Sequence, residues 1–343
     1  MDPSSRSEYV MASLASITIH SSQFPDQVRR DLVESLRSRQ ISPKFHYDSI
    51  KQSQQWLALH RAFSPAWVDP AGRAVYDRAF AATAARINGT SLRVIGLGCG
   101  GGQKEAGLLR ALQTPGRHLI YQPVDVSVAM VLTARQAALP FVSENDCFPV
   151  VGDLTAITDW STIGFSSDTS PAPRVLTFFG MLPNLEPSLA FPRLGQLTRP
   201  GDLLLVSANL APGNDYAAGV RTVLPQYDNA LTRDWLLTFV FDLGFDRADG
   251  EVKFSIEPAS DDATLLRVTA CFHVVRTCRI DLGDDRFEFA IGDSIRLFYS
   301  YRYTPARVAG CLAQQGLTVL DQWITPSGEE GVFLANRKPA APA

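Results

Sequence analysis

The feature that most constrains this chain is a glycine-rich turn that directly follows a short apolar segment. The segment Leu92–Leu97 is rich in residues that favour a buried strand, and it leads into a cluster of glycines. A strand end that turns against a ligand needs glycine, because a Cβ would collide with the ligand or force a strained φ. Gly98, Gly100 and Gly102 alternate through this turn, and a dinucleotide-type G-x-G-x-x-G pattern also fits residues 96–101. The turn therefore predicts a nucleotide-type ligand and leaves the kind of nucleotide open.

Strand-like and helix-like segments alternate on both sides of this turn. Short apolar runs bounded by turn residues are typical of buried strands, and apolar residues at helical spacing indicate the helices between them. We predict strands at 92–97, 118–124, 149–153, 174–180 and 202–207, and helices at 27–37, 71–87, 105–112 and 127–139. This order predicts an α/β fold with a parallel sheet covered by helices on both faces. Ligands of such sheets bind outside the carboxyl ends of the strands.

Two aspartates follow the ends of the second and third predicted strands. Asp125, after the second strand, is placed to accept hydrogen bonds from both hydroxyls of a ribose. Asp153 closes the third strand after a glycine, where a carboxylate fits the amino group of an adenine. Lys104, just past the glycine turn, is within reach of a cofactor carboxylate. The alternatives are that the aspartates cap the helices that follow them, and that Lys104 is an exposed helix residue.

The alternation stops after about residue 211 and resumes near the end of the chain. In between, we predict a helix at 234–243 and strands at 251–256, 264–276, 287–291 and 295–303. A helix at 304–315 and strands at 318–325 and 331–336 then complete the sheet. We therefore expect a cofactor-binding core, a substrate-binding domain of α+β character and flexible termini. The core is 71–211 with 304–338, the substrate-binding domain is 20–70 with 212–303, and the termini are 1–19 and 339–343.

Composition and charge argue against several classes of protein. The formal net charge is −3, and no basic run forms the face that a nucleic acid needs. No apolar run approaches the ~20 residues of a membrane span, and the N-terminus lacks the apolar core of a signal peptide. The five cysteines and five histidines show no disulfide or metal-ligand spacing. We expect a cytoplasmic monomer or weak homodimer without a metal, a nucleic-acid partner or a membrane anchor.

Several short motifs, taken together in their order along the chain, resemble a known family. They are Leu97-Gly98-Cys99-Gly100 with Gln103-Lys104, Pro123-Val124-Asp125-Val126-Ser127, Gly152-Asp153, Asn184-Leu185-Glu186-Pro187, Pro200-Gly201-Asp202, Gln226-Tyr227-Asp228, and Ile295-Arg296 with Ser300-Tyr301-Arg302-Tyr303. From about Pro43 to its end, the chain resembles the histidine-specific methyltransferase family. Members of that family form hercynine for ergothioneine biosynthesis, and fungal relatives methylate the amine of dimethylallyltryptophan. The resemblance implies a class I methyltransferase sheet of Rossmann-like form, S-adenosylmethionine (SAM) as cofactor, and a substrate domain built from the N-terminal segment and a late insertion.

The resemblance also implies roles for individual residues. The residues expected to bind the cofactor are Gly98, Gly100, Gly102, Lys104, Asp125, Asp153, Leu154 and Phe179. Asn184 would hold the amino and carboxylate groups of the substrate, and Tyr227 would bind the carboxylate. These two are the expected catalytic residues, because they would orient the amine where no dedicated general base is evident. Tyr47 would lie near the substrate side chain and Ser300 at the far end of the pocket. Because side chains alternate along a strand, one face of 299–303 is expected to meet the pocket.

Four positions depart from the pattern of the family. The acid two residues before the first loop glycine is Gly96 here, which predicts a looser hold on the methionine end of the cofactor, and a family tyrosine falls on Ser64. The glutamate that reads the imidazole of histidine falls on Phe298, and a neighbouring methionine falls near Ala270. A buried imidazole N–H without an acceptor costs roughly 1–3 kcal/mol, and specificity built on that bond does not survive its loss. Phe298 and Ala270 are therefore expected to line a wider, more apolar pocket that does not select histidine.

The predicted function is SAM-dependent N-methylation of an amino acid or of a small molecule derived from one. Two alternatives remain at this point: a nicotinamide-dependent oxidoreductase, and a methyltransferase-fold binding protein without catalysis. The oxidoreductase would place its acid ~20 residues after the first glycine, whereas Asp125 lies farther along. The missing acid at Gly96 is what leaves the second alternative open.

Overall fold

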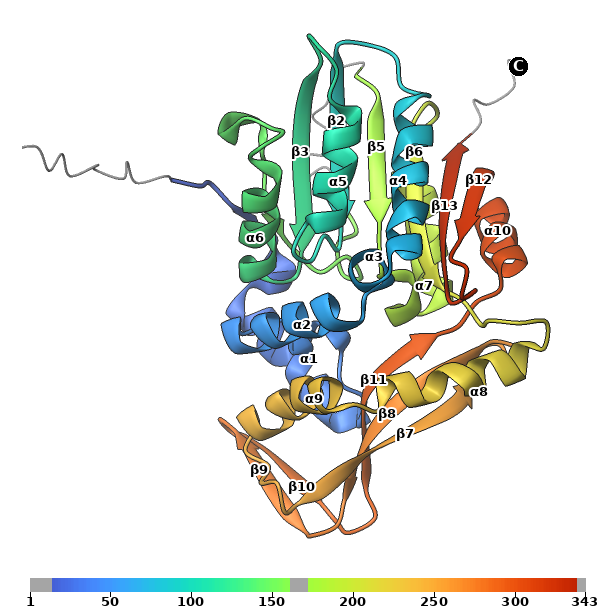
Figure 1. Ribbon diagram of the computed structural model, residues 1–343. Helices are drawn as coiled ribbons and strands as arrows, with labels where there is room; N and C mark the ends of the chain where they lie inside the picture. Colours follow the sequence, from blue (N-terminus) through green and yellow to red (C-terminus); the bar gives the residue numbers. More distant parts are fainter. Residues whose placement is uncertain (1–13, 161–171, 338–343) are drawn as a thin grey trace, which may run out of the picture.

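An eight-stranded sheet forms the centre of the larger part of the molecule (Figure 1). The structure, a computed structural model, describes residues 14–160 and 172–337. The strand order is β1-β4-β3-β2-β5-β6-β13-β12, with the strands from β1 to β6 parallel and β13 antiparallel to both of its neighbours. The strands are β1 (Thr18–Ile19), β2 (Ser91–Leu97), β3 (His118–Asp125), β4 (Val150–Val151), β5 (Arg174–Phe178), β6 (Leu203–Asn209), β12 (Leu317–Ile324) and β13 (Glu330–Arg337).

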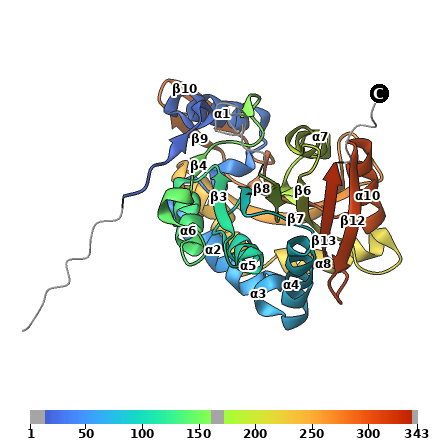
Figure 2. The ribbon, with the colours of Figure 1, turned by 90° about the horizontal axis from the view of Figure 1, so that it is seen from above.

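Helices cover both faces of this sheet (Figure 2). One face carries α4 (Pro70–Ala84), α5 (Gln103–Leu112) and α6 (Val128–Ala138), and the other carries α7 (Pro187–Leu197) and α10 (Pro305–Gln314). Successive residues of a strand point to opposite faces. Val94 therefore packs in the apolar core beneath α4, α5 and α6, and Ile95 packs in the core beneath α7 and α10. The predicted α/β class is therefore confirmed.

The N-terminal segment and the late insertion together form a second part at the carboxyl ends of the parallel strands (Figure 1). Its sheets are β11-β8-β7 and the hairpin β9-β10. Val33 and Leu36 of the N-terminal segment share one apolar core with Trp235 and Phe272 of the insertion. The elements are α1 (Pro25–Ser38), α2 (Ile50–Phe63), α3 (Pro65–Val68), α8 (Tyr216–Tyr227), α9 (Ala230–Asp242), β7 (Gly250–Pro258), β8 (Leu266–Val274), β9 (Cys278–Leu282), β10 (Asp285–Phe289) and β11 (Ser294–Tyr301).

The structure departs from the predicted elements where the local sequence signal is weak. Helices α7 and α8 were not predicted, because each contains a proline, Pro192 or Pro225, that ordinarily interrupts a helix. Helix α2 and strand β9 were also missed. Residues 18–19, which lie within the predicted flexible terminus 1–19, form β1 and pair with β4. Residues 1–13 and 339–343 lie outside the described residues.

Candidate active site

The glycine-rich turn joins β2 to α5 at the carboxyl edge of the sheet. Gly98, Gly100 and Gly102 have φ angles of 66°, 52° and 72°, in the left-handed region that favours glycine. Protein atoms also fill the space that side chains would need. A Cβ on Gly100 would lie 3.0 Å from the ring of Trp56, and one on Gly102 would lie 2.5 Å from Cα of Ala134. The turn therefore requires glycine both for its backbone and for the close approach of α2 and α6.

The carboxylate of Asp125, at the end of β3, ties that strand to the glycine turn. Oδ2 accepts a hydrogen bond from the backbone N–H of Gly100 at 2.9 Å, and Oδ1 accepts one from that of Ser127 at 3.1 Å. Burial raises the pKa of this carboxyl to about 6, against the lowering effect of these backbone hydrogen bonds. The N-cap of α6 is Ser127, so the helix-cap alternative is wrong for Asp125. The backbone N–H of Val126 also bonds to this carboxylate, which still keeps acceptor capacity that a ribose hydroxyl can use.

Asp153 makes a different set of contacts. Its Oδ1 accepts hydrogen bonds from the backbone N–H and the hydroxyl of Thr155, at 2.8 and 2.6 Å. Its Oδ2 lies 3.6 Å from Nζ of the buried Lys44, which also pairs with Asp31. Asp153 therefore caps the turn that follows β4, and it also joins the N-terminal segment to the sheet. Its contact with an adenine stays a prediction.

Lys104 points toward α4 and β13. Its Nζ donates a hydrogen bond to the hydroxyl of Tyr76 at 2.7 Å and lies 3.5 Å from Oε1 of Glu330. Only 11% of the side chain is exposed, so the alternative of an exposed lysine is wrong. The ring of Phe179, just after β5, meets that of Tyr76 edge to face, with centroids 5.6 Å apart. Sequence reasoning missed Tyr76 and Glu330, because no motif links them to the glycine turn.

Glu105, one residue further along α5, is a second buried carboxyl that sequence reasoning missed. Its Oε1 accepts a hydrogen bond from the hydroxyl of Thr177 at 3.0 Å, and burial raises its pKa to about 7. A Cβ on Gly96 would lie 3.4 Å from Cγ of Glu105 and 3.2 Å from the hydroxyl of Tyr121. The space that an acid at position 96 would use is thus occupied by a carboxyl from α5.

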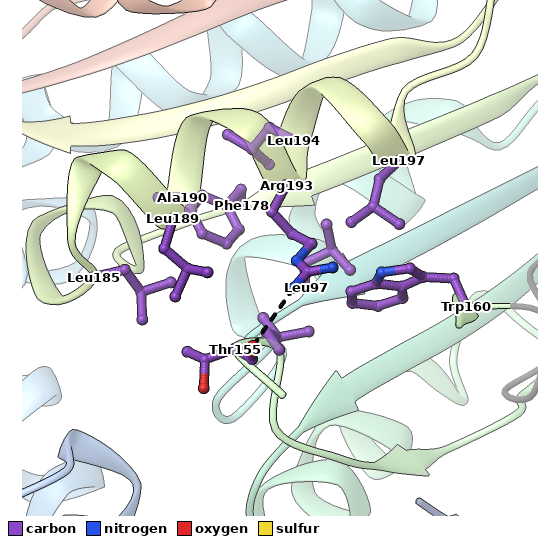
Figure 3. A pocket seen from close by; sticks show the side chains of 11 residues that line it. Leu97, Thr155, Trp160, Phe178, Leu185, Leu189, Ala190, Arg193, Leu194 and Leu197 are labelled. Carbon is purple, nitrogen blue, oxygen red and sulfur yellow. Dashed lines mark hydrogen bonds between the residues drawn. The ribbon is translucent and has the colours of Figure 1, made fainter. Parts of the chain in front are cut away.

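Figure 3 shows a small apolar cavity beneath α7. Leu154 is one of the residues that line it. The cavity measures about 10 Å³, which is room for one water molecule and not for a cofactor. Its wall includes the neighbouring side chains Leu97, Phe178, Leu194 and Leu197. Leu154 therefore packs in the core beneath α7, and its contact with a cofactor stays a prediction.

Tyr227, at the end of α8, is the centre of a hydrogen-bond network with β11. Its hydroxyl donates to Oγ of Ser300 at 2.9 Å and accepts from Nη2 of Arg302 at 2.6 Å. Arg302 also donates to the carbonyl of Leu210, and Asn209 donates to Ser300. The guanidinium group is buried, so a positive charge lies directly behind the phenol of Tyr227. The network brings together two of the predicted substrate residues.

Side chains along β11 alternate between this network and the core. Ser300 and Arg302 meet Tyr227, whereas Tyr299, Tyr301 and Tyr303 pack in the apolar core on the α7 face of the large sheet. The predicted alternation of this segment is therefore confirmed. Arg302 was named only as part of a motif and was given no role, although its spacing from Ser300 was the signal that could have indicated one.

Aromatic rings lie between the network and the glycine turn. The ring of Phe298 is 6.0 Å from that of Tyr227 and 5.9 Å from that of Trp235. Trp235 lies 5.6 Å from Tyr47, which in turn lies 5.7 Å from Trp56 above the turn. Tyr47 is thus placed between the two predicted sites, and the negative charge of Asp125, secondary to burial, raises the pKa of its phenol.

Asn184 and Ala270 both contact the β11 region from neighbouring elements. Asn184 ends the short helix η5 (Leu182–Asn184) after β5, and its Nδ2 donates to the carbonyl of Tyr299 at 2.7 Å. Ala270 pairs with Phe298 across β8 and β11 and is fully buried. Ala270 therefore lies next to Phe298 on the sheet, and its direct contact with a substrate stays a prediction.

The described residues contain no group of three or more histidine, cysteine, aspartate or glutamate side chains arranged to hold a metal ion. Within the described ranges, no helix is long and apolar enough to cross a membrane.

The sheet order, with its antiparallel β13 next to β6, and the glycine turn beside Asp125 define a class I SAM-dependent methyltransferase. Residues 27–337 match the model of the histidine-specific, SAM-dependent methyltransferase family, and the chain belongs to that family. The predicted family and cofactor are therefore confirmed, and the nicotinamide-dependent alternative is wrong.

The individual relatives share little sequence identity with this chain. The N-methyltransferase imqF of Aspergillus flavus is 26% identical over 251 residues, which cover 70% of this chain and 66% of that protein. The chain thus spans just under two thirds of the length of this curated relative. The CcbJ methyltransferase of Streptomyces caelestis is 12% identical, with 87% of this chain and 99% of that chain covered and a TM-score of 0.43. The magnesium protoporphyrin IX methyltransferase ChlM of Synechocystis PCC 6803, solved with bound SAH, is 12% identical, with coverage of 86% and 98% and a TM-score of 0.43.

Proposed function

We propose that this protein transfers a methyl group from SAM to the amine nitrogen of an aromatic or otherwise bulky amino acid, or of a small molecule derived from one. The observation that carries the proposal is the position of Phe298. Its ring lies between those of Tyr227 and Trp235, beside the network around Ser300. A phenyl ring offers no acceptor to the N–H of an imidazole, and a buried donor left unpaired costs roughly 1–3 kcal/mol. The pocket therefore suits a flat apolar side chain better than histidine.

The residues around the glycine turn fit SAM as the bound cofactor. Bound SAM supplies an electrophilic methyl group, so the protein mainly has to position the acceptor. Asp125 would accept hydrogen bonds from the ribose hydroxyls, because its two oxygens are already oriented by Gly100 and Ser127. Trp56 of α2 covers the turn and would help to exclude water from it.

The network around Tyr227 supports recognition of a carboxylate on the substrate. The buried guanidinium of Arg302 polarises the hydroxyl of Tyr227 and places positive charge behind it. Charge-assisted hydrogen bonds of this kind are stronger than neutral ones. Asn184, held against β11 through Tyr299, would orient the amino group from the end of β5.

The acceptor nitrogen has to be neutral at the moment of transfer, because an ammonium group has no lone pair. Positive charge then develops on that nitrogen as the methyl group arrives. The rings of Tyr47 and Trp235 lie together near the turn, and aromatic faces stabilise a nearby cation by about 0.5–2 kcal/mol. This arrangement supports a nitrogen acceptor.

The same proposal includes the organisation of the chain. Residues 71–211 with 304–338 would form the SAM-binding core, and 20–70 with 212–303 the substrate-binding domain, supported by the apolar core that the latter two segments share. All five cysteines are free thiols, which suits a reducing compartment. We therefore propose a cytoplasmic monomer or weak homodimer whose partner is a small-molecule amine.

A substrate screen tests the proposal. The protein would be incubated with labelled SAM and a panel of amino acids and biogenic amines, and mass spectrometry would locate and count the transferred methyl groups. We expect N-methylated products from aromatic members of the panel and none from L-histidine. A preference for L-histidine, or methylation on oxygen, would contradict the proposal.

Affinity for the demethylated cofactor tests the remaining alternative of a binding protein without catalysis. Isothermal titration with S-adenosylhomocysteine (SAH) is expected to give a dissociation constant in the micromolar range. An affinity weaker than millimolar, together with an empty screen, would favour the non-catalytic alternative.

A further inference from the structure

Glu330, the first residue of β13, is a buried carboxylate with one oxygen unused. Its side chain is 9% exposed. The hydroxyl of Tyr76 donates a short hydrogen bond to Oε1, and Nζ of Lys104 lies 3.5 Å from the same oxygen. The other oxygen, Oε2, is buried and has no hydrogen-bond partner among the described residues. A buried charged acceptor in this state is costly unless a ligand completes it.

The carboxylate of Glu330 lies between the two halves of the proposed active site, the glycine turn with its neighbours and the network around Ser300. On one side, Lys104 belongs to the first turn of α5, directly after the glycine turn, and Phe179 at the end of β5 packs against Tyr76. On the other side, Glu330 pairs with Asn209 across β13 and β6, and Asn209 donates a hydrogen bond to Ser300 of the substrate network. A ligand that spans both halves would pass this carboxylate.

The charges of Lys104 and Glu330 complement one type of chemical group. An α-amino acid head group carries an ammonium and a carboxylate on the same carbon, and the two side chains present the opposite charges side by side. Lys104 has no acceptor function and Glu330, when ionised, has no donor function. A zwitterion can therefore replace the contact between Lys104 and Glu330 with two charge-assisted hydrogen bonds, one from Lys104 to its carboxylate and one from its ammonium to Glu330.

We propose that Lys104 and Glu330 together bind the zwitterionic head group of an α-amino acid, with Oε2 of Glu330 accepting the ammonium and Lys104 donating to the carboxylate. Two ligands of this enzyme could carry that group: the methionine end of the cofactor, and an amino-acid substrate. The cofactor is the occupant that the contacts favour, because Lys104 follows the glycine turn and Gly96 provides no acid of its own. The second source rests on the proposed function, whereas the first rests only on the family and its cofactor.

The test compares ligands with and without the head group. SAH carries it, and 5′-methylthioadenosine has the same adenosine and thioether without it. Dissociation constants for both would be measured by isothermal titration for the wild type, Glu330→Gln and a matched control. Glu329→Gln is that control, because Glu329 is the preceding residue and is only half-buried, with its carboxylate accepting a hydrogen bond from Gln226. L-tryptophan would be titrated into SAH-saturated protein as the probe for the second source.

We expect Glu330→Gln to weaken SAH binding at least tenfold and 5′-methylthioadenosine binding less than twofold, with Glu329→Gln unchanged for both. Loss of L-tryptophan binding with SAH binding intact would assign the head group to the substrate instead. If Glu330→Gln bound both SAH and L-tryptophan as tightly as the wild type, the inference would be overturned. An equal loss for SAH and 5′-methylthioadenosine would also overturn it, because it would indicate a purely structural role. An empty substrate screen would contradict the proposed function without altering the comparison of the two cofactor analogues.

Discussion

The hydroxyl of Tyr227 donates a hydrogen bond to Oγ of Ser300 over 2.9 Å, although α8 and β11 belong to different parts of the insertion. The same hydroxyl accepts from the buried Arg302. Tyr227 is therefore held in a fixed orientation with a positive charge behind it, and to bind a substrate carboxylate it would have to redirect the O–H that it donates to Ser300.

Removing this hydroxyl should affect the methyl acceptor and leave the cofactor unaffected. In Tyr227→Phe we expect KM for the acceptor identified by the screen to rise about fivefold to tenfold, because one hydrogen bond of about 1–1.5 kcal/mol is lost. Steady-state kinetics would measure KM and kcat, and titration with SAH would serve as the internal control. A parallel loss of SAH affinity would contradict the assignment of Tyr227 to the substrate.

Asp125 should make cofactor affinity depend on pH. Its pKa is raised to about 6 by burial, and ribose hydroxyls donate to the ionised carboxylate better than to the neutral acid. SAH affinity is therefore expected to rise as pH increases from 5 to 7 and to level off above that. In Asp125→Asn this dependence should disappear and affinity at pH 8 should fall about 10- to 100-fold, for a lost charge-assisted hydrogen bond of about 1.5–3 kcal/mol.

Titration calorimetry across this pH range would measure both effects. Asp321→Asn is a matched control, because Asp321 lies on β12 and pairs with Arg86 on the surface. A pH-independent SAH affinity in the wild type would show that Asp125 does not bind the ribose in its ionised form.

Glu105 should make folding stability depend on pH in the opposite sense to an acid whose pKa is lowered by folding. Its pKa is about 7 in the folded protein and 4.5 in its ordinary state. Between these values the folded state binds more protons than the unfolded state, so the contribution of Glu105 to the free energy of unfolding falls as pH rises. Glu105→Gln removes this contribution and is expected to gain stability relative to the wild type between pH 5 and 8.

Urea denaturation at several pH values would measure this difference. Glu34→Gln, on the exposed side of α1, should follow the wild type at every pH. If plots of the free energy of unfolding against pH stayed parallel for Glu105→Gln and the wild type, the carboxyl of Glu105 would not be the group that titrates.

Restoring an acceptor at position 298 should create affinity for histidine. In SAH-loaded Phe298→Glu we expect saturable binding of L-histidine by calorimetry, with none in the wild type, because a carboxylate can pair with the imidazole N–H. Phe298→Gln keeps a polar side chain of similar size without the charge and should bind more weakly. Wild-type protein that bound L-histidine as tightly as Phe298→Glu would refute the role given to this ring.

The parts of the site that follow strand ends could be predicted from the sequence. Gly100 and Asp125 each lie directly after a buried apolar segment, and parallel strands bring their carboxyl ends to one edge of the sheet. The hydrogen bond between them follows from that order. Tyr227 and Ser300 were brought together only by the resemblance to a family, since nothing local in α8 indicates its partner in β11.

The contacts between elements far apart in the chain could not be predicted. Trp56 lies over Gly100 and Lys44 reaches Asp153, which joins the two parts of the molecule, and Glu330 meets Lys104 within the large-sheet part. Lys104 and Asp153 illustrate the consequence. Their residue types suggested a cofactor, while their surroundings show that other protein groups also use them.

Secondary structure is largely a property of short segments, and for this protein the sequence alone indicated the glycine turn, most of the alternating strands and helices around it, and an interruption where the insertion begins. The occupants of the space around the turn were known only once the elements had packed. The carboxyl of Glu105 fills the place of the missing acid at Gly96, and one buried oxygen of Glu330 is left without a partner among the described residues. Both facts depend on distances between residues that no local sequence pattern connects.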